Sequence, residues 1–209
     1  MKKISLVLIA LAIGIVSCKN EKKETKSETQ IESAITEKFV VKPEATSVEW
    51  TAYKTTEKLP VGGEFKILKF ENKEGATPQE ALNNLNFSIP ISSLFTNDAT
   101  NTRDAKIMES FFGAMLDTEF LKGTINLKDS AYSATITMNG VTKDLPLKVS
   151  ITEERRVSMT GTMLLKDWDA LEALESLNKA CFDLHKGPDG VSKTWDEVAI
   201  NVNTYLREN

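Results

Sequence analysis

Residues 132–149, YSATITMNGVTKDLPLKV, decide the fold of this chain. In the first half, apolar side chains alternate with serine and threonine, which is the two-residue period of a strand with one apolar and one solvated face. Asn139-Gly140 follows, a pair that tolerates the positive φ angles of a two-residue hairpin turn. The alternation then returns at Leu145, Leu147 and Val149. The pattern predicts a β-hairpin, and a lone hairpin is marginally stable, so other strands must cover its apolar face.

Similar alternation elsewhere predicts the remaining strands. It occurs in residues 38–42, 47–55, 64–70, 85–91, 118–128, 155–165 and 194–206. Between two of these segments, Pro60 and Gly62-Gly63 predict a turn. About eight sequential, amphipathic strands favour an antiparallel up-and-down sheet, which can close into a barrel with room for one small ligand. A sandwich of two sheets has the same periodicity and stays an alternative.

Two or three short helices are expected among the strands. Residues 77–80, TPQE, contain the cap, the proline and the acid that are typical of a helix start. Residues 98–116 and 168–182 carry apolar side chains at spacings of three and four, which predicts two amphipathic helices. Asp167 and Asp169 stand at the start of the last helix and are predicted to cap it.

The N-terminal segment predicts export and anchoring. Two lysines precede an apolar run, residues 4–16, that is too short to span a bilayer. The run ends at Ser17-Cys18 and resembles a bacterial lipobox, so residues 1–17 are expected to be a lipoprotein signal peptide and Cys18 the lipidated residue. Residues 18–37 are polar and predict a flexible tether, which leaves residues 38–209 as the folded domain. The expected location is the cell envelope, at the periplasmic or surface face of a bacterial membrane.

Composition and motifs limit the chemistry that the chain can perform. A formal net charge of −4 without a basic cluster argues against nucleic acid as a partner. One histidine, His185, cannot build a multi-histidine metal site, and the motifs of nucleotide binding and serine hydrolysis are absent. Cys181 precedes it by four residues, but a lone cysteine on an apolar helix face is more often a core residue. We therefore expect no catalytic residue, no metal and no cofactor, and a binding protein rather than an enzyme.

The inward faces of the strands supply the candidate ligand-binding residues. These faces carry aromatic, branched and thioether side chains, and methionine adapts well to irregular hydrocarbon shapes. The candidates are Trp50, Ile136, Met138, Met159, Met163, Ile200 and Val202. The same faces would suit a barrel that its own side chains fill. Gly161, which lies among the inward positions, marks either space inside the barrel or a bend in the strand.

Arg103-Asp104 has two interpretations. A guanidinium can bind a phosphate head group with two parallel hydrogen bonds, so Arg103 is a candidate head-group contact. Alternatively, Arg103 fastens the start of its helix to a neighbouring loop, with Asp104 at the positive end of the helix. The second interpretation is favoured.

Several motifs occur in a characteristic order along the domain. They are Val48-Glu49-Trp50 with Lys54, Val61-Gly62-Gly63-Glu64-Phe65, Ile89-Pro90-Ile91-Ser92-Ser93-Leu94, Thr102-Arg103-Asp104, Phe111-Phe112, and Asn139-Gly140-Val141-Thr142-Lys143 followed by Leu145-Pro146-Leu147. Together they resemble the YceI-like domain, also called the lipid- or polyisoprenoid-binding, lipocalin-like domain. The resemblance implies a mainly β fold, an extended eight-stranded antiparallel barrel with a long apolar cavity for an isoprenoid or similar amphiphile, in an exported protein.

Pattern and resemblance lead to one expected function. We expect a membrane-anchored envelope protein, without enzymatic activity, that sequesters or carries an apolar lipid, with an isoprenoid as the first choice. The alternative is a structural or partner-binding lipoprotein whose barrel is packed shut. The sequence does not determine the oligomeric state, and a homodimer is one of the possibilities.

Overall fold

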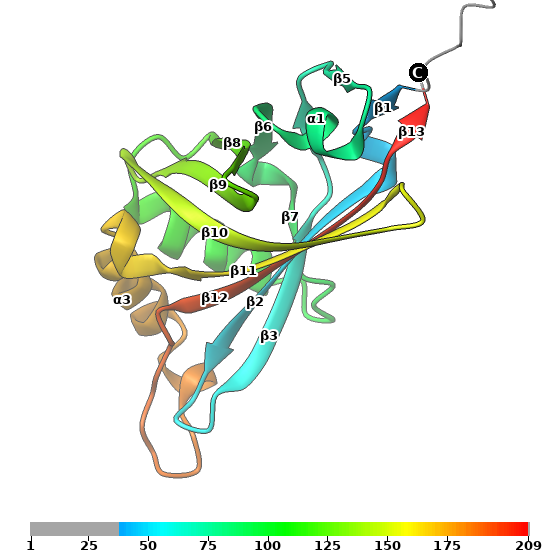
Figure 1. Ribbon diagram of the computed structural model, residues 1–209. Coiled ribbons are helices and arrows are strands. Elements are labelled where there is room, and N and C mark those ends of the chain that lie inside the picture. The colour runs from blue at the N-terminus through cyan, green and yellow to red at the C-terminus, as the bar shows by residue number, and fades with distance from the viewer. Residues whose placement is uncertain (1–37, 209) are drawn as a thin grey trace, which may run out of the picture. The chain divides into compact units, whose positions relative to one another are not determined.

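One antiparallel sheet dominates residues 38–208, the part of the chain that the computed structural model describes. Its ten strands lie in the order β4-β6-β8-β9-β10-β11-β12-β2-β3-β7 (Figure 1). Eight of them are six or more residues long: β2 Thr46–Lys54, β3 Leu59–Phe65, β6 Leu85–Pro90, β8 Phe120–Lys128, β9 Ala131–Met138, β10 Val141–Thr152, β11 Arg156–Leu164 and β12 Glu197–Tyr205. The other two, β4 Lys69–Phe70 and β7 Leu94–Phe95, have two residues each and lie at the edges.

The hairpin predicted for residues 132–149 is confirmed and lies in the middle of this sheet. β9 and β10 pair in a register that begins with Met138 opposite Val141. Asn139 and Gly140 form the turn with φ angles of 52° and 72°, so both central residues have the positive φ of a two-residue hairpin turn. The alternation also holds, because Met138 and Leu145 are buried while Thr137 is exposed.

The turn predicted at residues 60–63 is wrong. These residues lie inside β3, and the chain reverses at residues 55–58, where Thr55 and Lys58 both have a φ of 60°. Packing explains the glycine. A Cβ atom on Gly63 would lie 2.4 Å from Cζ2 of Trp50, the residue opposite it on β2. Gly63 therefore makes room for an indole ring rather than for a turn.

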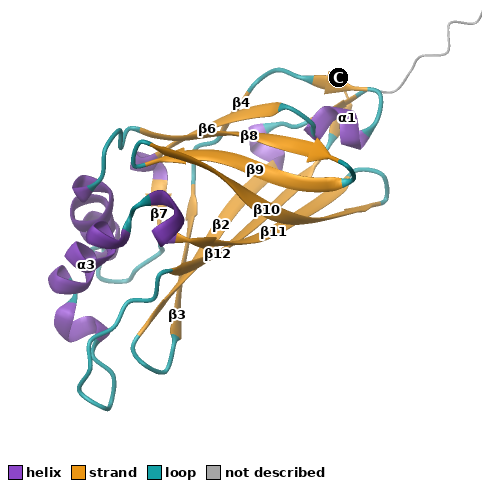
Figure 2. Cartoon of the chain, turned by 60° about the vertical axis from the view of Figure 1, so that its left-hand side comes forward, coloured by secondary structure: helices purple, strands orange, loops and turns teal. Residues whose placement is uncertain are grey.

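Two short strands bring β3 and β6 together and so curl the sheet: β4 follows β3 but pairs with β6, and β7 follows β6 but pairs with β3. The chain leaves β3 and forms β4, which pairs with β6. It leaves β6 through the short helix η2 Ile91–Ser93 and forms β7, which pairs with β3 (Figure 2). The described strand pairs include no direct ladder between β3 and β6. The expected eight-stranded barrel is therefore a curled ten-stranded sheet, joined at what we call the seam: the two-residue ladders β4–β6 and β3–β7.

A three-stranded sheet closes one end of the curled sheet. In it, β1 Phe39–Val40 lies between β13 Arg207–Glu208 and β5 Glu74–Gly75. The predicted helix start at residues 77–80 is confirmed beside it, in α1 Pro78–Leu82, where the hydroxyl of Thr77 accepts the N–H of Glu80 at 3.2 Å. Val40, Leu82 and Leu206 are at most 1 % exposed, so apolar side chains seal this end.

A 3-10 turn, η1 Pro43–Ala45, links β1 to β2, whereas the helices from α2 onward lie at the opposite end, as Figures 1 and 2 show. α2 Arg103–Lys106 continues into a π-helical turn, η3 Ile107–Phe111, and a 3-10 turn, η4 Phe112–Ala114. α3 Leu171–Ala180 packs against η3, with η5 Leu165–Trp168 before it and η6 Phe182–His185 after it. The two helices predicted here are present but shorter and less regular. No helix within residues 38–208 is both long and apolar enough to cross a membrane.

The caps predicted at Asp167 and Asp169 do not form. Neither η5 nor α3 has a side-chain hydrogen bond at its N-terminal cap. Asp167 lies within the first turn of η5, and Asp169 follows that helix with a left-handed φ of 52°. This left-handed residue separates η5 from α3, so the last helix begins at Leu171, later than the sequence pattern indicates.

The side chain of Asn139 connects the hairpin to both helical segments. Its Oδ1 accepts the N–H of Leu116, just after η4, at 3.0 Å, and its Nδ2 donates to the carbonyl of Asp169 at 3.0 Å. Beside it the indole of Trp168, 1 % exposed, donates to the carbonyl of Ile136 at 3.0 Å. The turn that shapes the hairpin thus also holds the helices against the sheet.

Replacing Gly63 tests whether it exists to accommodate Trp50. The extended backbone of β3 accepts alanine, so Gly63→Ala should cost about 1–3 kcal/mol of unfolding free energy through overpacking alone. Gly62→Ala is the matched control. The atom nearest to its Cβ would be the backbone oxygen of Trp50, at 3.5 Å, followed by Oγ1 of Thr51 at 4.0 Å. Urea unfolding measures both. Equal stability of the two variants would show that Gly63 has another role, whereas adding Trp50→Leu to Gly63→Ala should recover part of the loss.

Candidate ligand cavity

A cavity of about 680 Å³ lies inside the curled sheet. Its volume is within the roughly 300–1,000 Å³ that is usual for small-molecule sites. All eight long strands contribute to its wall, because alternate residues of each strand point inward. The interior is therefore open, and a barrel packed shut by its own side chains is not what the chain forms.

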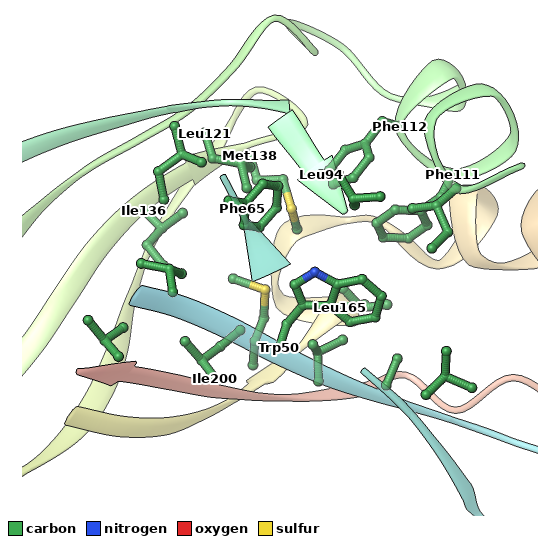
Figure 3. A pocket seen from close by; sticks show the side chains of 18 of the residues that line it. Trp50, Phe65, Leu94, Phe111, Phe112, Leu121, Ile136, Met138, Leu165 and Ile200 are labelled. Carbon is green, nitrogen blue, oxygen red and sulfur yellow. The ribbon is translucent and has the colours of Figure 1, made fainter. Parts of the chain in front are cut away.

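All seven residues proposed from the sequence as ligand contacts lie on the wall of this cavity. They are Trp50, Ile136, Met138, Met159, Met163, Ile200 and Val202. Figure 3 shows Trp50, Ile136, Met138 and Ile200 around the open volume. Strand periodicity was sufficient to place them on one face. Their contact with a ligand stays a prediction.

Other wall residues were not identified from the sequence. Six of them are labelled in Figure 3: Phe65, Leu94, Phe111, Phe112, Leu121 and Leu165. Phe111 and Phe112 are consecutive, yet both are buried and both reach the cavity, with ring centroids 5.1 Å apart and ring planes at 72°. The change from π-helical to 3-10 geometry between them permits this. Strand alternation could have identified Phe65 and Leu121, but no sequence signal marks the change of helix type.

Gly161 does not leave free volume in the cavity. A Cβ atom there would lie 3.0 Å from the carbonyl oxygen of Pro146 and 3.1 Å from Cδ2 of Leu147, both on β10. The neighbouring strand therefore fills the space that a side chain would occupy. The other interpretation of this glycine, a bend, remains a prediction.

Most polar residues of the cavity wall gather at the helical end, which we call the mouth. They are Tyr53, Lys54, Asp98, Thr100, Thr102, Arg103, Lys106, His185 and Thr194. Leu184, also on the wall here, is 56 % exposed, so this end reaches the solvent. At the opposite end the wall includes Thr46 and Thr204, whose hydroxyls are 2.8 Å apart and hydrogen-bond to each other. The cavity is thus apolar along its length and polar at its open end.

Arg103 lies at the mouth and holds the loop before its helix. Its Nη2 is 3.3 Å from Oδ1 of Asp98. Hydrogen bonds, first from the hydroxyl of Thr100, together with the charge of Arg103, hold the pKa of Asp98 below its usual range. Asp104 accepts the N–H of Thr96 at 3.1 Å. These contacts fasten the start of α2 to the preceding loop, which is the structural role that the sequence favoured for Arg103. A contact between Arg103 and a head group stays a prediction.

His185 is uncharged at neutral pH. Burial, and then the nearby charges of Lys54 and Lys106, lower its pKa to about 4. Its Nδ1 lies 2.7 Å from the hydroxyl oxygen of Thr194, and that hydroxyl donates to Oδ1 of Asn178 at 2.8 Å. Nδ1 therefore carries the proton and donates to Thr194. This chain of hydrogen bonds fixes the ring at the mouth.

Cys181, four residues earlier, lines the same cavity as a buried free thiol. Burial raises its pKa, which disfavours the reactive thiolate at neutral pH. Residues 38–208 contain no group of three or more histidine, cysteine, aspartate or glutamate side chains that could hold a metal ion. The sequence interpretation of Cys181 as a small apolar residue agrees with this position.

The chain matches one protein-family model and several solved structures. A family model described as "YceI-like domain" matches residues 39–206. No curated protein matches the chain significantly. A solved polyisoprenoid binding domain from Saccharophagus degradans, implicated in plant cell wall breakdown, superposes with a TM-score of 0.59 at 12% identity, covering 82% of this chain and 98% of that one. This match shows a shared fold.

Two further solved structures are more distant in shape. Burkholderia cenocepacia BcnA has a TM-score of 0.47 at 13% identity, over 79% of this chain and 98% of that one. The Campylobacter jejuni YCEI protein has a TM-score of 0.47 at 20% identity, over 71% of this chain and 85% of that one.

The low pKa of His185 predicts a pH-dependent stability. In the unfolded chain its pKa returns to about 6.5, so between pH 6.5 and pH 4 the unfolded chain binds a proton that the folded chain does not. The free energy of unfolding should therefore fall as the pH is lowered through this window. His185→Gln removes this proton uptake. The slope of the unfolding free energy against pH should then decrease in this window by the contribution of at most about one proton. Urea unfolding at a series of pH values measures both proteins, and parallel curves would contradict the assignment.

Proposed function

The chain belongs to the YceI-like domain family, and from that premise we propose that it binds an apolar lipid in the cavity of its curled sheet. One observation carries the proposal: about 680 Å³ of open volume whose wall is mostly apolar and to which all eight long strands contribute. Each Å² of apolar surface that leaves water on filling this volume contributes roughly 25 cal/mol. A hydrocarbon chain is the ligand that gains most from such a wall.

An isoprenoid is the first ligand class to test. Three methionines, Met138, Met159 and Met163, line the cavity beside aromatic rings, and flexible thioethers adapt to the methyl branches of such a chain. The fold shared with a polyisoprenoid binding domain supports the same choice. The protein would sequester or carry this lipid rather than transform it, because its cavity presents hydrocarbon to most of the ligand.

We also propose that the domain is anchored to a membrane of the cell envelope through acylated Cys18, on a periplasmic or surface face. Residues 1–37 lie outside the described residues, so the support is the sequence alone: two lysines, an apolar run and then Ser17-Cys18. A lipid-binding domain attached in this way stays close to the source of its ligand.

Native mass spectrometry tests the binding proposal. Residues 36–209, which form one compact unit, would be purified from a lipid-rich bacterial host, and the bound material extracted with solvent. We expect a stoichiometric apolar molecule. A clean mass without ligand, unchanged after incubation with quinones and polyprenols, would contradict the proposal.

A substitution inside the cavity provides the matched variant. Ile136→Trp should place a large ring in the open volume and lower the fraction of bound lipid at least tenfold. Thr137→Trp, the next residue on the outer face of β9, is the control and should keep its lipid. Equal lipid content in the two variants would place the ligand elsewhere.

The anchor is tested by changing one atom of the full chain. Cys18→Ser replaces the sulfur that would be acylated, and should move the protein from the membrane fraction to the aqueous fraction of lysed cells. Cys181→Ser controls for loss of a thiol and should leave the distribution unchanged. Membrane association of the Cys18→Ser variant would contradict the lipid anchor without affecting the binding proposal.

A further inference from the structure

We propose that the cavity selects amphiphiles with an anionic head group, a carboxylate or a phosphate, which Lys54 and Lys106 bind at the mouth. This inference rests on the proposed function, because it names the chemical class of the ligand that the cavity takes. It assigns a head-group site to residues that both lie on the cavity wall.

The two lysines come from separate elements, and both line the cavity at its mouth. Lys54 is the last residue of β2, and Lys106 is the last residue of α2. The charges of both act on the same two side chains, His185 and Cys181, in the segment that follows α3. Both lysines therefore lie on the cavity wall near His185 and Cys181, at the end where a head group would lie.

Neither ammonium group has a carboxylate partner among the described residues. Lys54 donates one hydrogen bond to the carbonyl of Leu184 at 3.0 Å, which leaves two N–H groups for a ligand. The ammonium group of Lys106 forms no ion pair with another residue in the described range, and only its backbone N–H is bonded, to the carbonyl of Thr102. The positive charge at this point is therefore not neutralised by the protein.

Two acidic residues near the mouth are paired with other cations, and Asp104 of α2 accepts hydrogen bonds from Thr96. Asp98, which lies on the cavity wall, pairs with Arg103 at 3.3 Å. Asp183, in η6, pairs with Lys186 at 3.2 Å and is largely exposed. His185 stays neutral near pH 7 and adds no further charge. The mouth thus presents two unpaired cations on a chain whose formal net charge is −4.

Filling the cavity makes this pair of cations selective. An apolar tail displaces water beside Lys54 and Lys106, and a partly buried ammonium group without an anion is costly. A carboxylate or phosphate compensates for the lost water with charge-assisted hydrogen bonds. A neutral alcohol with the same tail gains the apolar contacts but leaves both ammonium groups without a counter-charge.

Chain-matched ligands test the inference on residues 36–209. Geranylgeranyl phosphate is compared with geranylgeraniol, and hexadecanoate with hexadecanol, by displacement of a fluorescent apolar probe. We expect each anion to bind about tenfold more tightly than its alcohol at low salt, and the difference to shrink as the ionic strength rises. The two pairs also distinguish a phosphate from a carboxylate as the preferred head group.

Two double variants locate the preference. Lys54→Gln/Lys106→Gln should bind anion and alcohol alike, with the affinity for the alcohol retained. Lys128→Gln/Lys148→Gln makes the same change in net charge at two exposed residues outside the cavity wall and should keep the preference.

Each result separates the head-group inference from the proposed function. Equal binding of anions and alcohols by the unmodified protein would overturn the inference and leave apolar binding in place. A preference that survives in Lys54→Gln/Lys106→Gln would overturn the assignment to these lysines. Binding of none of the four ligands, together with a purified protein that carries no lipid, would overturn the proposed function and the inference with it.

Discussion

Every long strand of this protein has one apolar face, and the structure depends on removing those faces from water. An antiparallel sheet of alternating strands can do this only by packing on another layer or by curling on itself, and this chain curls. A curled sheet of eight long strands is wide enough to hold one small ligand when its inward side chains do not fill it. The cavity of about 680 Å³ is therefore a result of the same alternation that folds the chain, and no separate binding element had to be added.

The two ends of the cavity differ: one is sealed by apolar side chains, and the other is open and polar. This difference distinguishes the two orientations in which an amphiphile could enter. Val40, Leu82 and Leu206 seal one end, where the small sheet and α1 pack. The other end is bounded by α2, η3 and α3, which the side chain of Asn139 holds to the central hairpin. Because most polar groups of the wall, and all of its charged ones, lie beside these helices, an amphiphile in the cavity would be favoured with its tail toward the small sheet.

Local signals predicted the parts of the fold that local residues determine. Alternation located the hairpin and the inward faces, and Thr77 identified the start of α1. The errors arose where the local structure depends on residues that are distant in the sequence. Gly63 serves the ring of Trp50 on the next strand, and the seam depends on how β3 and β6 approach each other. The mouth was missed for the same reason, since nothing near Lys106 in the sequence says that Lys54 and His185 lie beside it. The signal peptide, the lipidated Cys18 and the tether remain predictions, because residues 1–37 lie outside the part of the chain that the structure describes.

The pairing of β1 with β13 has a consequence for the order of folding. Phe39 pairs with Glu208, so the small sheet joins the two ends of the domain across nearly its whole length. Loop-closure entropy makes such a contact unfavourable until the intervening chain is already compact. We therefore expect the sealed end to form last, after the sheet has curled around its interior. On that order of folding, the domain would pass through a stage in which its hollow is open at both ends.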